Sequence, residues 1–359
     1  MTGDTVGGVW TFTLELARAM GDRGIEVTLA AMGGHASRSQ RAEAGKIRNL
    51  RLFTTPLKLE WMEQPWEDVE AAGDWLLDLE QRVRPDVIHM NAYGAGADGG
   101  WNAPVILTAH SCVRSWWRAV RGEEAGAEWT RYTDTVARAV RNAVCFTAPS
   151  RFMLESVERD YGPVPRGVVI PNGRSAATFR ALPKEPFIFS AGRVWDDAKN
   201  LETLARAADP EGWPIYVAGA LRGRDGAERS LQGCHTLGRL SAAAVKDWYA
   251  RASIYALPAL YEPFGLSILE AALSDCALLL GDIPSLRENW EGAAIFLPPG
   301  DADALRWHLR MLENDGERRR RMGVQARERA AQFTVARMTD AYVRCYRAAT
   351  QAEEVACAS

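Results

Sequence analysis

Residues 253–282 read SIYALPALYEPFGLSILEAALSDCALLLGD, in which an apolar run, a Pro-Phe-Gly turn, an amphipathic stretch and a second apolar run follow one another. Short apolar runs are typical of buried strands, and the stretch between them repeats its apolar residues with a helical period. A strand, a helix and a second strand in this order form the repeating unit of a parallel sheet, whose ligands bind beyond the carboxyl ends of the strands. The segment therefore predicts an α/β domain with a ligand site near its turn.

The same alternation of strands and helices extends over most of the chain. Further strands are expected at IEVTLAAM, PDVIHMN, APVILTAH, VCFTAPS, GVVIPNG, FIFSAGR and PIYVAGA. The stretch SAATFRALPKEP interrupts the pattern and is interpreted as a linker. We therefore expect two Rossmann-like domains, residues 1–176 and 185–331, followed by an amphipathic helix at residues 332–350. Only two or three residues precede the first glycine-rich turn, so the first strand is expected to be short or missing.

The composition limits the partners that the protein is expected to have. The 359 residues are 47% hydrophobic and 25% charged, with a formal net charge of −3, which is typical of globular proteins and gives no reason to expect nucleic acid as a partner. The six cysteines contain no CxxC pair, so we expect reduced thiols, a cytoplasmic location and no structural zinc. No run of about 18 apolar residues and no signal peptide is found, which predicts no transmembrane segment and leaves peripheral membrane contact open. The basic run at residues 318–321 is interpreted as a solvated helix face.

Glu262 and Glu270 stand on either side of the Pro-Phe-Gly turn, with seven residues between them. Together with the stretches described below, this pair resembles the paired-glutamate motif of the retaining glycosyltransferases of family 4. The resemblance covers nearly the whole chain. It implies the GT-B fold, in which two Rossmann-like domains face each other across a cleft. The first domain would then bind the acceptor and the second the nucleotide sugar, and the last helix would cross back to the first domain.

The turn between the two glutamates suits an anion. The backbone N–H groups of Phe264, Gly265 and Leu266 lie at the predicted start of a helix, where unpaired donors and the positive end of the helix dipole favour phosphate or sugar oxygens. In family members, the carboxylate matched by Glu262 contacts hydroxyls of the donor sugar, and the carboxylate matched by Glu270 holds the nucleotide ribose. Two other interpretations stay open: a solvated helix face, and a retaining glycosidase that uses both carboxylates.

The stretch SAGRVWDDAKN carries two cations after a predicted strand. Arg193 and Lys199 match the pair that neutralises the donor diphosphate in the family. Two fixed cations stabilise a leaving diphosphate without a metal ion, so we expect neither a metal site nor a cofactor. The acidic pair Asp196-Asp197 has the wrong spacing for an Asp-x-Asp metal site and is interpreted as a loop or helix cap. Asn200 replaces the glycine that the family often has after this lysine.

In the first domain, Gly7 and Gly8 precede a predicted helix and match the glycine-rich loop that family members place over the diphosphate and the acceptor. His110 ends the predicted strand in ILTAHS, at the position where the family has a histidine near the transferred sugar. His89, which also ends a strand, is interpreted as a structural residue. Three tryptophans that follow His110 either pack in the core or offer flat faces to an acceptor sugar; they are Trp116, Trp117 and Trp129.

Three further stretches match the family with less chemical content. TLGRLSAAAVKDWY resembles the segment whose backbone contacts the nucleotide base, which makes Arg239 and Leu240 expected donor-binding residues. APSRF and VIPNG resemble segments near the domain junction, where Ser150 and Asn172 could line the cleft. The family commonly continues Pro-Asn-Gly with an apolar residue and Asp, whereas this chain has Arg174 followed by serine.

The resemblance implies an enzyme that moves a sugar from a nucleotide diphosphate sugar to a hydroxyl group, with retention of configuration and without a metal ion. His110, Glu262, Arg193 and Lys199 would be its catalytic residues, and the leaving phosphate would serve as the base. The acceptor would be a sugar, a lipid-linked molecule or another small molecule. Two alternatives stay open: a disaccharide synthase or phosphorylase of the same architecture, and a sugar-nucleotide-binding protein with impaired catalysis. The sugar, the base, the acceptor and the oligomeric state cannot be read from the sequence.

Overall fold

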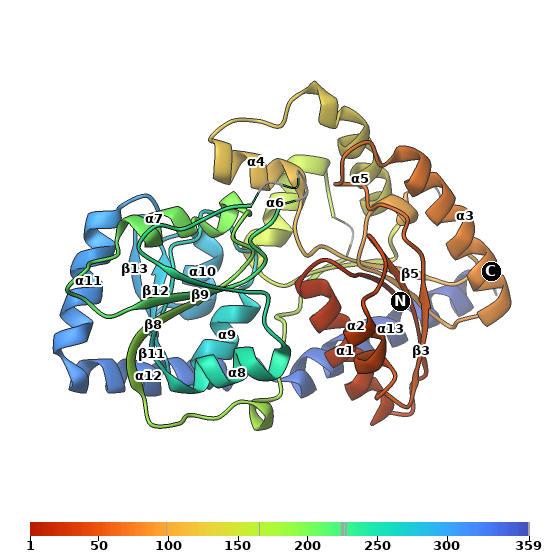
Figure 1. The fold of residues 1–359 in the computed structure, drawn as a ribbon. Coiled ribbons are helices and arrows are strands. Elements are labelled where there is room, and N and C mark those ends of the chain that lie inside the picture. Colours follow the sequence, from red (N-terminus) through yellow and green to blue (C-terminus); the bar gives the residue numbers. More distant parts are fainter. Residues whose placement is uncertain (98, 165, 224–225, 227, 358–359) are drawn as a thin grey trace. The chain divides into compact units, whose positions relative to one another are not determined.

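The computed structural model describes residues 1–97, 99–164, 166–223, 226 and 228–357. The chain forms two compact units, each built from parallel strands and helices (Figure 1). The first unit comprises Met1–Arg118, Glu123–Gly173 and the segment that starts at Val335, and the second comprises Ala119–Gly122 and Arg174–Thr334. Within the described part of the chain, no helix is both long and apolar enough to span a membrane.

The first unit has two parallel sheets, in the orders β1-β2-β3 and β4-β5-β6-β7. The strands are β1 (Thr2–Asp4), β2 (Val27–Met32), β3 (Leu50–Thr54), β4 (Ile88–Met90), β5 (Val105–Thr108), β6 (Cys145–Ala148) and β7 (Gly167–Val169). The short first strand expected from the sequence is β1, which has three residues and pairs with β2. Its Thr2 is also bound by Asn91, just after β4: Asn91 N donates to Thr2 Oγ1 and Asn91 Nδ2 donates to Thr2 O, both at 2.7 Å. A side chain thus links β1 to the end of β4.

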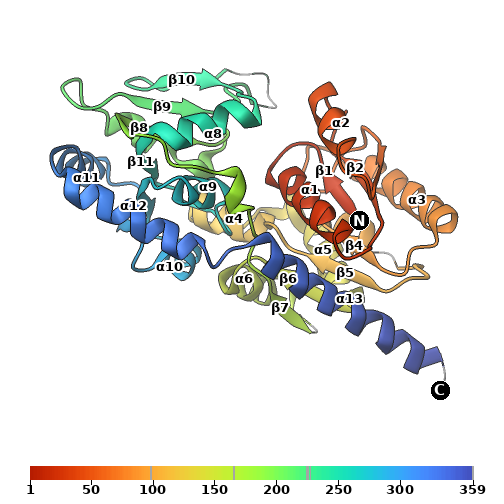
Figure 2. The same cartoon turned by 90° about the horizontal axis from the view of Figure 1, so that it is seen from below.

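The helices of the first unit have apolar stripes that cover these strands. They are α1 (Gly8–Gly21), α2 (Arg38–Ala44), α3 (Trp66–Val83), α4 (Val113–Arg121, which starts in this unit), α5 (Thr130–Asn142), α6 (Arg151–Tyr161) and α13 (Val335–Cys357). Phe12 and Leu16 of α1 share one buried cluster with Met338 and Tyr342 of α13. The C-terminal helix therefore returns to the first unit, as expected, and Figure 2 shows it alongside α1 and the strands of that unit.

His89 connects α13 to the sheet. Its Nδ1 lies 2.7 Å from Tyr346 Oη, and its Nε2 lies 2.7 Å from Thr108 Oγ1 on the neighbouring strand β5. Burial lowers the pKa of His89 well below its usual value, so the ring is neutral and able to both donate and accept. His89 has a structural role, as the sequence suggests.

The second unit has one parallel sheet of order β10-β9-β8-β11-β12-β13. Its strands are β8 (Glu185–Ala191), β9 (Ile215–Ala218), β10 (His235–Gly238), β11 (Ala252–Leu257), β12 (Ala277–Gly281) and β13 (Ile295–Leu297). Its helices are α7 (Leu201–Arg206), α8 (Ala242–Arg251), α9 (Leu266–Leu273), α10 (Pro284–Trp290), α11 (Ala302–Asn314) and α12 (Gly316–Ala330). The opening segment of the sequence forms β11, α9 and β12, so the predicted order of strand, helix and strand is confirmed.

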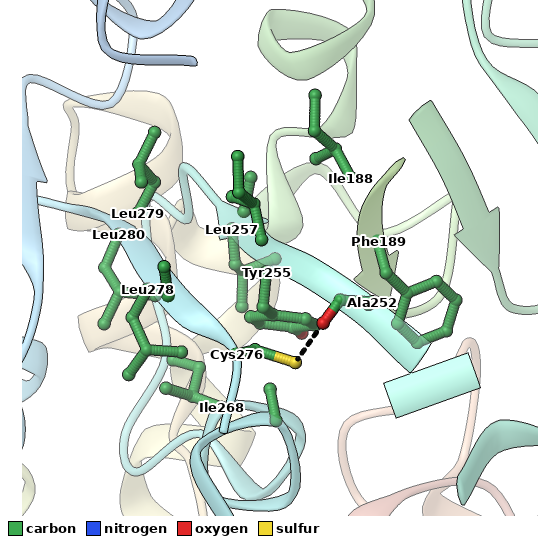
Figure 3. Close-up of a cluster of buried hydrophobic side chains, with 14 of the residues drawn as sticks. Ile188, Phe189, Ala252, Tyr255, Leu257, Ile268, Cys276, Leu278, Leu279 and Leu280 are labelled. Carbon is green, nitrogen blue, oxygen red and sulfur yellow. Dashed lines mark hydrogen bonds between the residues drawn. The ribbon is translucent and has the colours of Figure 1, made fainter. Parts of the chain in front are cut away.

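The core of the second unit is built around β11 and β12 (Figure 3). Both strands are buried along their whole length, which explains why they are continuous apolar runs rather than alternating ones. The thiol of Cys276, which directly precedes β12, donates to the carbonyl oxygen of Ala252 at the start of β11, at 3.4 Å. Burial raises the pKa of this thiol. Each leucine of β12 removed from water contributes roughly 1.5–3 kcal/mol. The core thus provides a rigid base for the loops at the carboxyl ends of the strands.

Candidate functional site

The turn before α9 is fixed by a glycine. Gly265 has φ +89°, and a Cβ built on it would lie 2.6 Å from Ile268 Cδ1. Since L-residues rarely adopt this conformation, and the space is closed as well, only glycine fits without strain. The backbone can therefore turn sharply from the end of β11 into the helix.

Glu262 and Lys199 meet at this turn. Glu262 Oε2 lies 2.6 Å from Lys199 Nζ, and Glu262 Oε1 accepts a hydrogen bond from Gly265 N at 3.0 Å. The two side chains are only 13% and 16% exposed, so water screens their attraction weakly. Because β8 and β11 are neighbours, the loops after them bring together two predicted catalytic residues that lie far apart in the sequence.

Arg193 lies in the same loop as Lys199. Its Nη2 is 2.5 Å from Asp196 Oδ2, and its guanidinium lies 5.2 Å from the centre of the Trp195 ring. Asp196 Oδ1 accepts from Ala198 N at 3.2 Å and so caps the short 3₁₀ helix that follows. Burial acts to raise the pKa of Asp196, but the charges of Arg193 and Lys199 lower it overall. Asp196 is therefore a cap and an ion-pair partner, as expected for the acidic pair.

The conformation of Asn200 explains why asparagine can replace the glycine that the family often has after this lysine. It has φ +52°, in the left-handed region where glycine is favoured and asparagine is tolerated. Its Nδ2 donates to Pro258 O at 2.9 Å and to Pro299 O at 2.6 Å. The side chain thus ties the loop of Lys199 to the loop after β11, which a glycine could not do.

Glu270 is paired with an arginine. Its Oε1 lies 2.9 Å from Arg174 Nη2, and the two side chains are 15% and 9% exposed. Sequence reasoning did not assign a role to Arg174; the only signal was that it departs from the family pattern. Arg174 N also donates to Phe333 O at 3.1 Å, where the chain reaches the end of the second unit.

Four other residues of the second unit were predicted to bind the donor, and the structure shows only where their side chains lie. Phe264 is buried and packs edge-to-face on Phe333, with ring centres 5.4 Å apart, so its side chain points into the core. Leu266 is half-buried against the same core. Arg239 is exposed and Leu240 is half-buried, and both follow the edge strand β10. Within the part of the chain that the structure describes, neither of the last two contacts Glu262 or Lys199, so their role stays a prediction.

In the first unit, His110 has a defined tautomer. Its Nε2 lies 2.7 Å from Asn91 Oδ1, and the amide nitrogen of Asn91 is used as a donor to Thr2 O. Nε2 must therefore carry the proton, which makes Nδ1 the acceptor. The ring packs against Phe12 at 4.7 Å between centres, and burial lowers the pKa of His110 to about 4. His110 is thus neutral near pH 7 and suited to accept a hydrogen bond from a hydroxyl.

The carboxylate of Asp4 already binds two backbone N–H groups of the glycine-rich loop. Asp4 Oδ1 accepts from Val6 N at 2.9 Å and from Gly7 N at 3.0 Å. Gly8 is exposed and is the first residue of α1. An anion that uses the N–H of Gly7 would have to displace Asp4, so of the two glycines Gly8 is the better placed for the role predicted for both.

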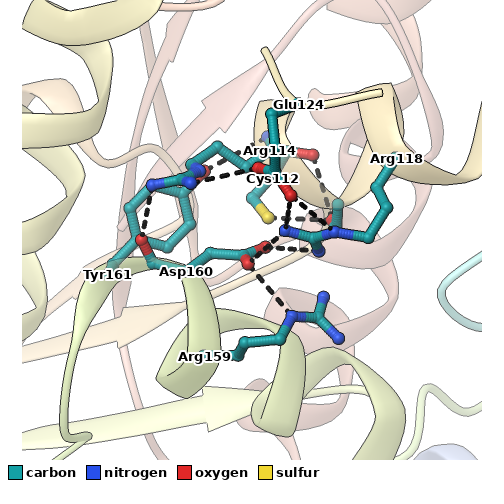
Figure 4. A network of polar contacts seen from close by, with 8 residues as sticks. Cys112, Arg114, Arg118, Glu124, Arg159, Asp160 and Tyr161 are labelled. Atoms are coloured by element: carbon teal, nitrogen blue, oxygen red, sulfur yellow. Dashed lines mark hydrogen bonds and ion pairs between the residues drawn. The ribbon is translucent and has the colours of Figure 1, made fainter. Parts of the chain in front are cut away.

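The tryptophan-bearing helix α4 follows His110 closely and is held by ion pairs to α6 (Figure 4). Arg118 contacts the buried Asp160 at 2.8 Å and the loop residue Glu124 at 2.8 Å, and Arg114 contacts Glu124 at 3.0 Å. The tryptophans of α4 are half-buried, and so is the later Trp129, which packs on Tyr132 with ring centres 5.7 Å apart. The two residues named near the domain junction are buried as well: Ser150 caps α6 by accepting from Met153 N, and Asn172 is only 6% exposed.

Among the described residues, no group of three or more His, Cys, Asp or Glu side chains is arranged to hold a metal ion.

Comparison with known proteins finds glycosyltransferase families over residues 6–329. The sequence pattern described as Glycosyltransferase Family 4 matches residues 6–177, and the pattern described as Glycosyl transferases group 1 matches residues 177–329. A D-inositol 3-phosphate glycosyltransferase from Xylanimonas cellulosilytica is 26% identical over 391 residues, covering 95% of this chain and 92% of that protein. An O-antigen chain mannosyltransferase B from Escherichia coli is 26% identical over 174 residues, covering 47% of this chain and 40% of that protein.

Solved structures share the fold. Sucrose-phosphate synthase from Thermosynechococcus elongatus has a TM-score of 0.79 at 19% identity, covering 100% of this chain and 96% of that one. HepE from Anabaena, solved in complex with UDP-glucose, has a TM-score of 0.75 at 15% identity, covering 97% of this chain and 99% of that one. At this level of identity the likeness concerns the fold, and it confirms the expected GT-B fold with its two Rossmann-like domains.

Proposed function

Because the chain belongs to the group 1 glycosyltransferases of family 4, we propose that it transfers a sugar from a nucleotide diphosphate sugar to an acceptor hydroxyl with retention of configuration. The observation that carries this proposal is the cluster of Lys199, Glu262 and Gly265, joined by contacts of 2.6 and 3.0 Å. The cation suits the phosphates of a nucleotide sugar, and the carboxylate suits its sugar hydroxyls. The glycine turn at the start of a helix lets the protein backbone approach the ligand closely.

The diphosphate would be held by Lys199 and Arg193. A lysine ammonium has three N–H donors, so Lys199 can bind Glu262 and phosphate oxygens at the same time. Arg193 already pairs with Asp196 and has further donors in its guanidinium. Both cations belong to one loop fixed by Asn200, so little reorganisation is needed as charge builds up on the leaving group.

The transfer step needs no covalent bond to the protein. The bond from the anomeric carbon to the diphosphate oxygen breaks, and the acceptor oxygen bonds to the same carbon on the same face. The acceptor proton passes to the leaving phosphate oxygen. Glu262 orients hydroxyls of the donor sugar, and the cations stabilise the developing negative charge without a metal ion. The neutral His110 of the first unit is suited to accept a hydrogen bond from a hydroxyl group.

The relatives suggest where to begin the search for substrates. HepE was solved with UDP-glucose, and the relative from Xylanimonas is named a D-inositol 3-phosphate glycosyltransferase. We therefore propose a nucleotide sugar as the donor, with UDP-sugars tested first, and a polyhydroxylated acceptor. The six cysteines of the sequence, which include no CxxC pair, support the proposal of a reducing, cytoplasmic place of action.

The proposal is tested by incubating the protein with a panel of sugar nucleotides and no acceptor, with EDTA present. Slow release of a nucleoside diphosphate from one of them is the expected result. Release that requires inorganic phosphate or a free sugar would favour the phosphorylase or disaccharide synthase alternative. Tight binding of a nucleotide with no turnover against any acceptor would favour the binding protein and contradict the proposal.

A further inference from the structure

We infer that Arg174 is a positioning residue that aims the carboxylate of Glu270 at the ribose of the donor nucleotide. The inference rests on the proposed function and adds a residue to its site. The pair lies within the second unit, with Arg174 Nη2 2.9 Å from Glu270 Oε1.

The contact is shielded from water. Arg174 is 9% exposed and Glu270 15%, so the pair has the geometry and the environment in which charge-assisted hydrogen bonds are strong. Removing one member would leave the other charge in a poorly hydrated place, which is costly. The orientation of Glu270 therefore depends on Arg174 rather than on solvent.

Both the backbone and the side chain of Arg174 have contacts within the second unit. The backbone N of Arg174 donates to Phe333 O at 3.1 Å, and Arg174 forms an isolated parallel bridge with Thr334. The guanidinium lies 5.3 Å from the centre of the Phe179 ring. Phe333 packs in turn on Phe264, which belongs to the same turn as Gly265. Arg174 is thus fixed to the turn that carries the donor site.

This arrangement has a chemical consequence for ribose. An ionised carboxylate accepts about four hydrogen bonds, so Glu270 can bind Arg174 and a ribose hydroxyl together. Arg174 fixes the plane of the carboxylate and offsets its charge near the diphosphate. The expected result of losing Arg174 is a weaker preference for ribose over deoxyribose, with a small effect on the phosphate contacts.

The test compares ribonucleotides with deoxyribonucleotides. The affinities of UDP, GDP and ADP, and of their 2′-deoxy forms, are measured by calorimetry for the wild type, Arg174→Gln and Arg174→Lys. The matched control is Arg251→Gln, since Arg251 pairs with Asp247 and Glu185 at the amino end of β11, at the opposite end of the sheet. Thermal melting checks that each variant is folded.

We expect Arg174→Gln to weaken the preferred ribonucleotide roughly tenfold and its deoxy form far less, so that the preference for ribose collapses. Arg174→Lys should retain part of that preference, and Arg251→Gln all of it. In Glu270→Gln, adding Arg174→Gln should change nothing further. An equal loss for ribose and deoxyribose forms, or a further loss in the double variant, would show that Arg174 acts only on stability. No binding of any nucleotide by the wild type would overturn the proposed function, and this inference with it.

Discussion

Lys199 Nζ lies 2.6 Å from Glu262 Oε2, which joins the cation expected at the phosphates to the carboxylate expected at the sugar. The two residues come from loops after adjacent strands of one sheet. Each therefore limits the position of the other before any donor arrives. In the proposed function, the ammonium is shared between Glu262 and the diphosphate of the donor, so changes to either residue should affect distinct parts of the same ligand.

Replacing Glu262 by glutamine should separate sugar binding from phosphate binding. The amide keeps the size of the side chain but loses the charge that pairs with Lys199. We expect the affinity for the sugar nucleotide to fall roughly tenfold, while the affinity for the bare nucleoside diphosphate stays equal or rises, because Lys199 is released from Glu262. Calorimetry with both ligands measures this. An equal loss of affinity for both would place Glu262 at the phosphates or in the fold alone.

Asn200 should be tolerant of glycine and intolerant of alanine. Alanine in the left-handed conformation costs about 1–2 kcal/mol, and the bonds to Pro258 and Pro299 are lost as well. We expect Asn200→Ala to lower the free energy of unfolding by roughly 2–3 kcal/mol and Asn200→Gly by about 1 kcal/mol less. Denaturant titration provides the values. If alanine and glycine were equally destabilising, backbone conformation would not be the reason for asparagine here.

Gly265→Ala should be more harmful than the same change at Gly292. Both glycines have positive φ, of +89° and +77°, but a Cβ on Gly265 meets Ile268, whereas a Cβ on Gly292 meets nothing within 4 Å. The backbone strain is thus shared and the clash is not. We expect Gly292→Ala to cost about 1 kcal/mol of stability and Gly265→Ala at least about 1 kcal/mol more, together with weaker nucleotide binding. Equal unfolding curves for the two variants would rule out the clash.

His110 should make the protein less stable in acid. Its pKa is about 4 in the folded protein and near 6.5 when unfolded, so the unfolded state binds the proton more readily. The contribution of His110 is complete above pH 6.5, declines as the pH falls and is lost below about pH 4. The slope is at most about 1.4 kcal/mol per pH unit. Since burial also lowers the pKa of His89, the measurement is the difference in unfolding free energy between wild type and His110→Gln across this range. A difference that does not change with pH would contradict the assignment.

The long buried elements of the fold could be predicted from sequence, and so could the edge strands β4 and β7, whereas three other edge strands could not. The apolar runs of β11 and β12 and the helix between them stand out because both faces of the strands are buried. The strands that escaped prediction are β3, β10 and β13, each at the edge of its sheet. Edge strands are short and partly exposed, so their apolar pattern is weak. In β10, the first two residues are exposed and the last two are half-buried.

The site followed the same division. The family resemblance pointed to Lys199, Glu262 and His110, and the pairing of β8 with β11 explains why the first two lie together. Their roles stay predictions. The pairing of Glu270 with Arg174 could not be read from the chain, since it joins residues far apart through no periodic pattern. The bonds of Asp4 to Gly7 depend on local loop geometry that residue types alone do not specify.

The most direct test of the account is the rate of nucleoside diphosphate release from the best sugar nucleotide, at saturating donor with EDTA, for the wild type and Lys199→Ala. Lys46→Ala, at an exposed lysine of the first unit, is the control. Loss of a donor that stabilises the leaving diphosphate should lower kcat roughly 10²–10³-fold in Lys199→Ala, while Lys46→Ala matches the wild type. Turnover that is unchanged in Lys199→Ala would contradict the central claim that this lysine, held by Glu262, stabilises the leaving group.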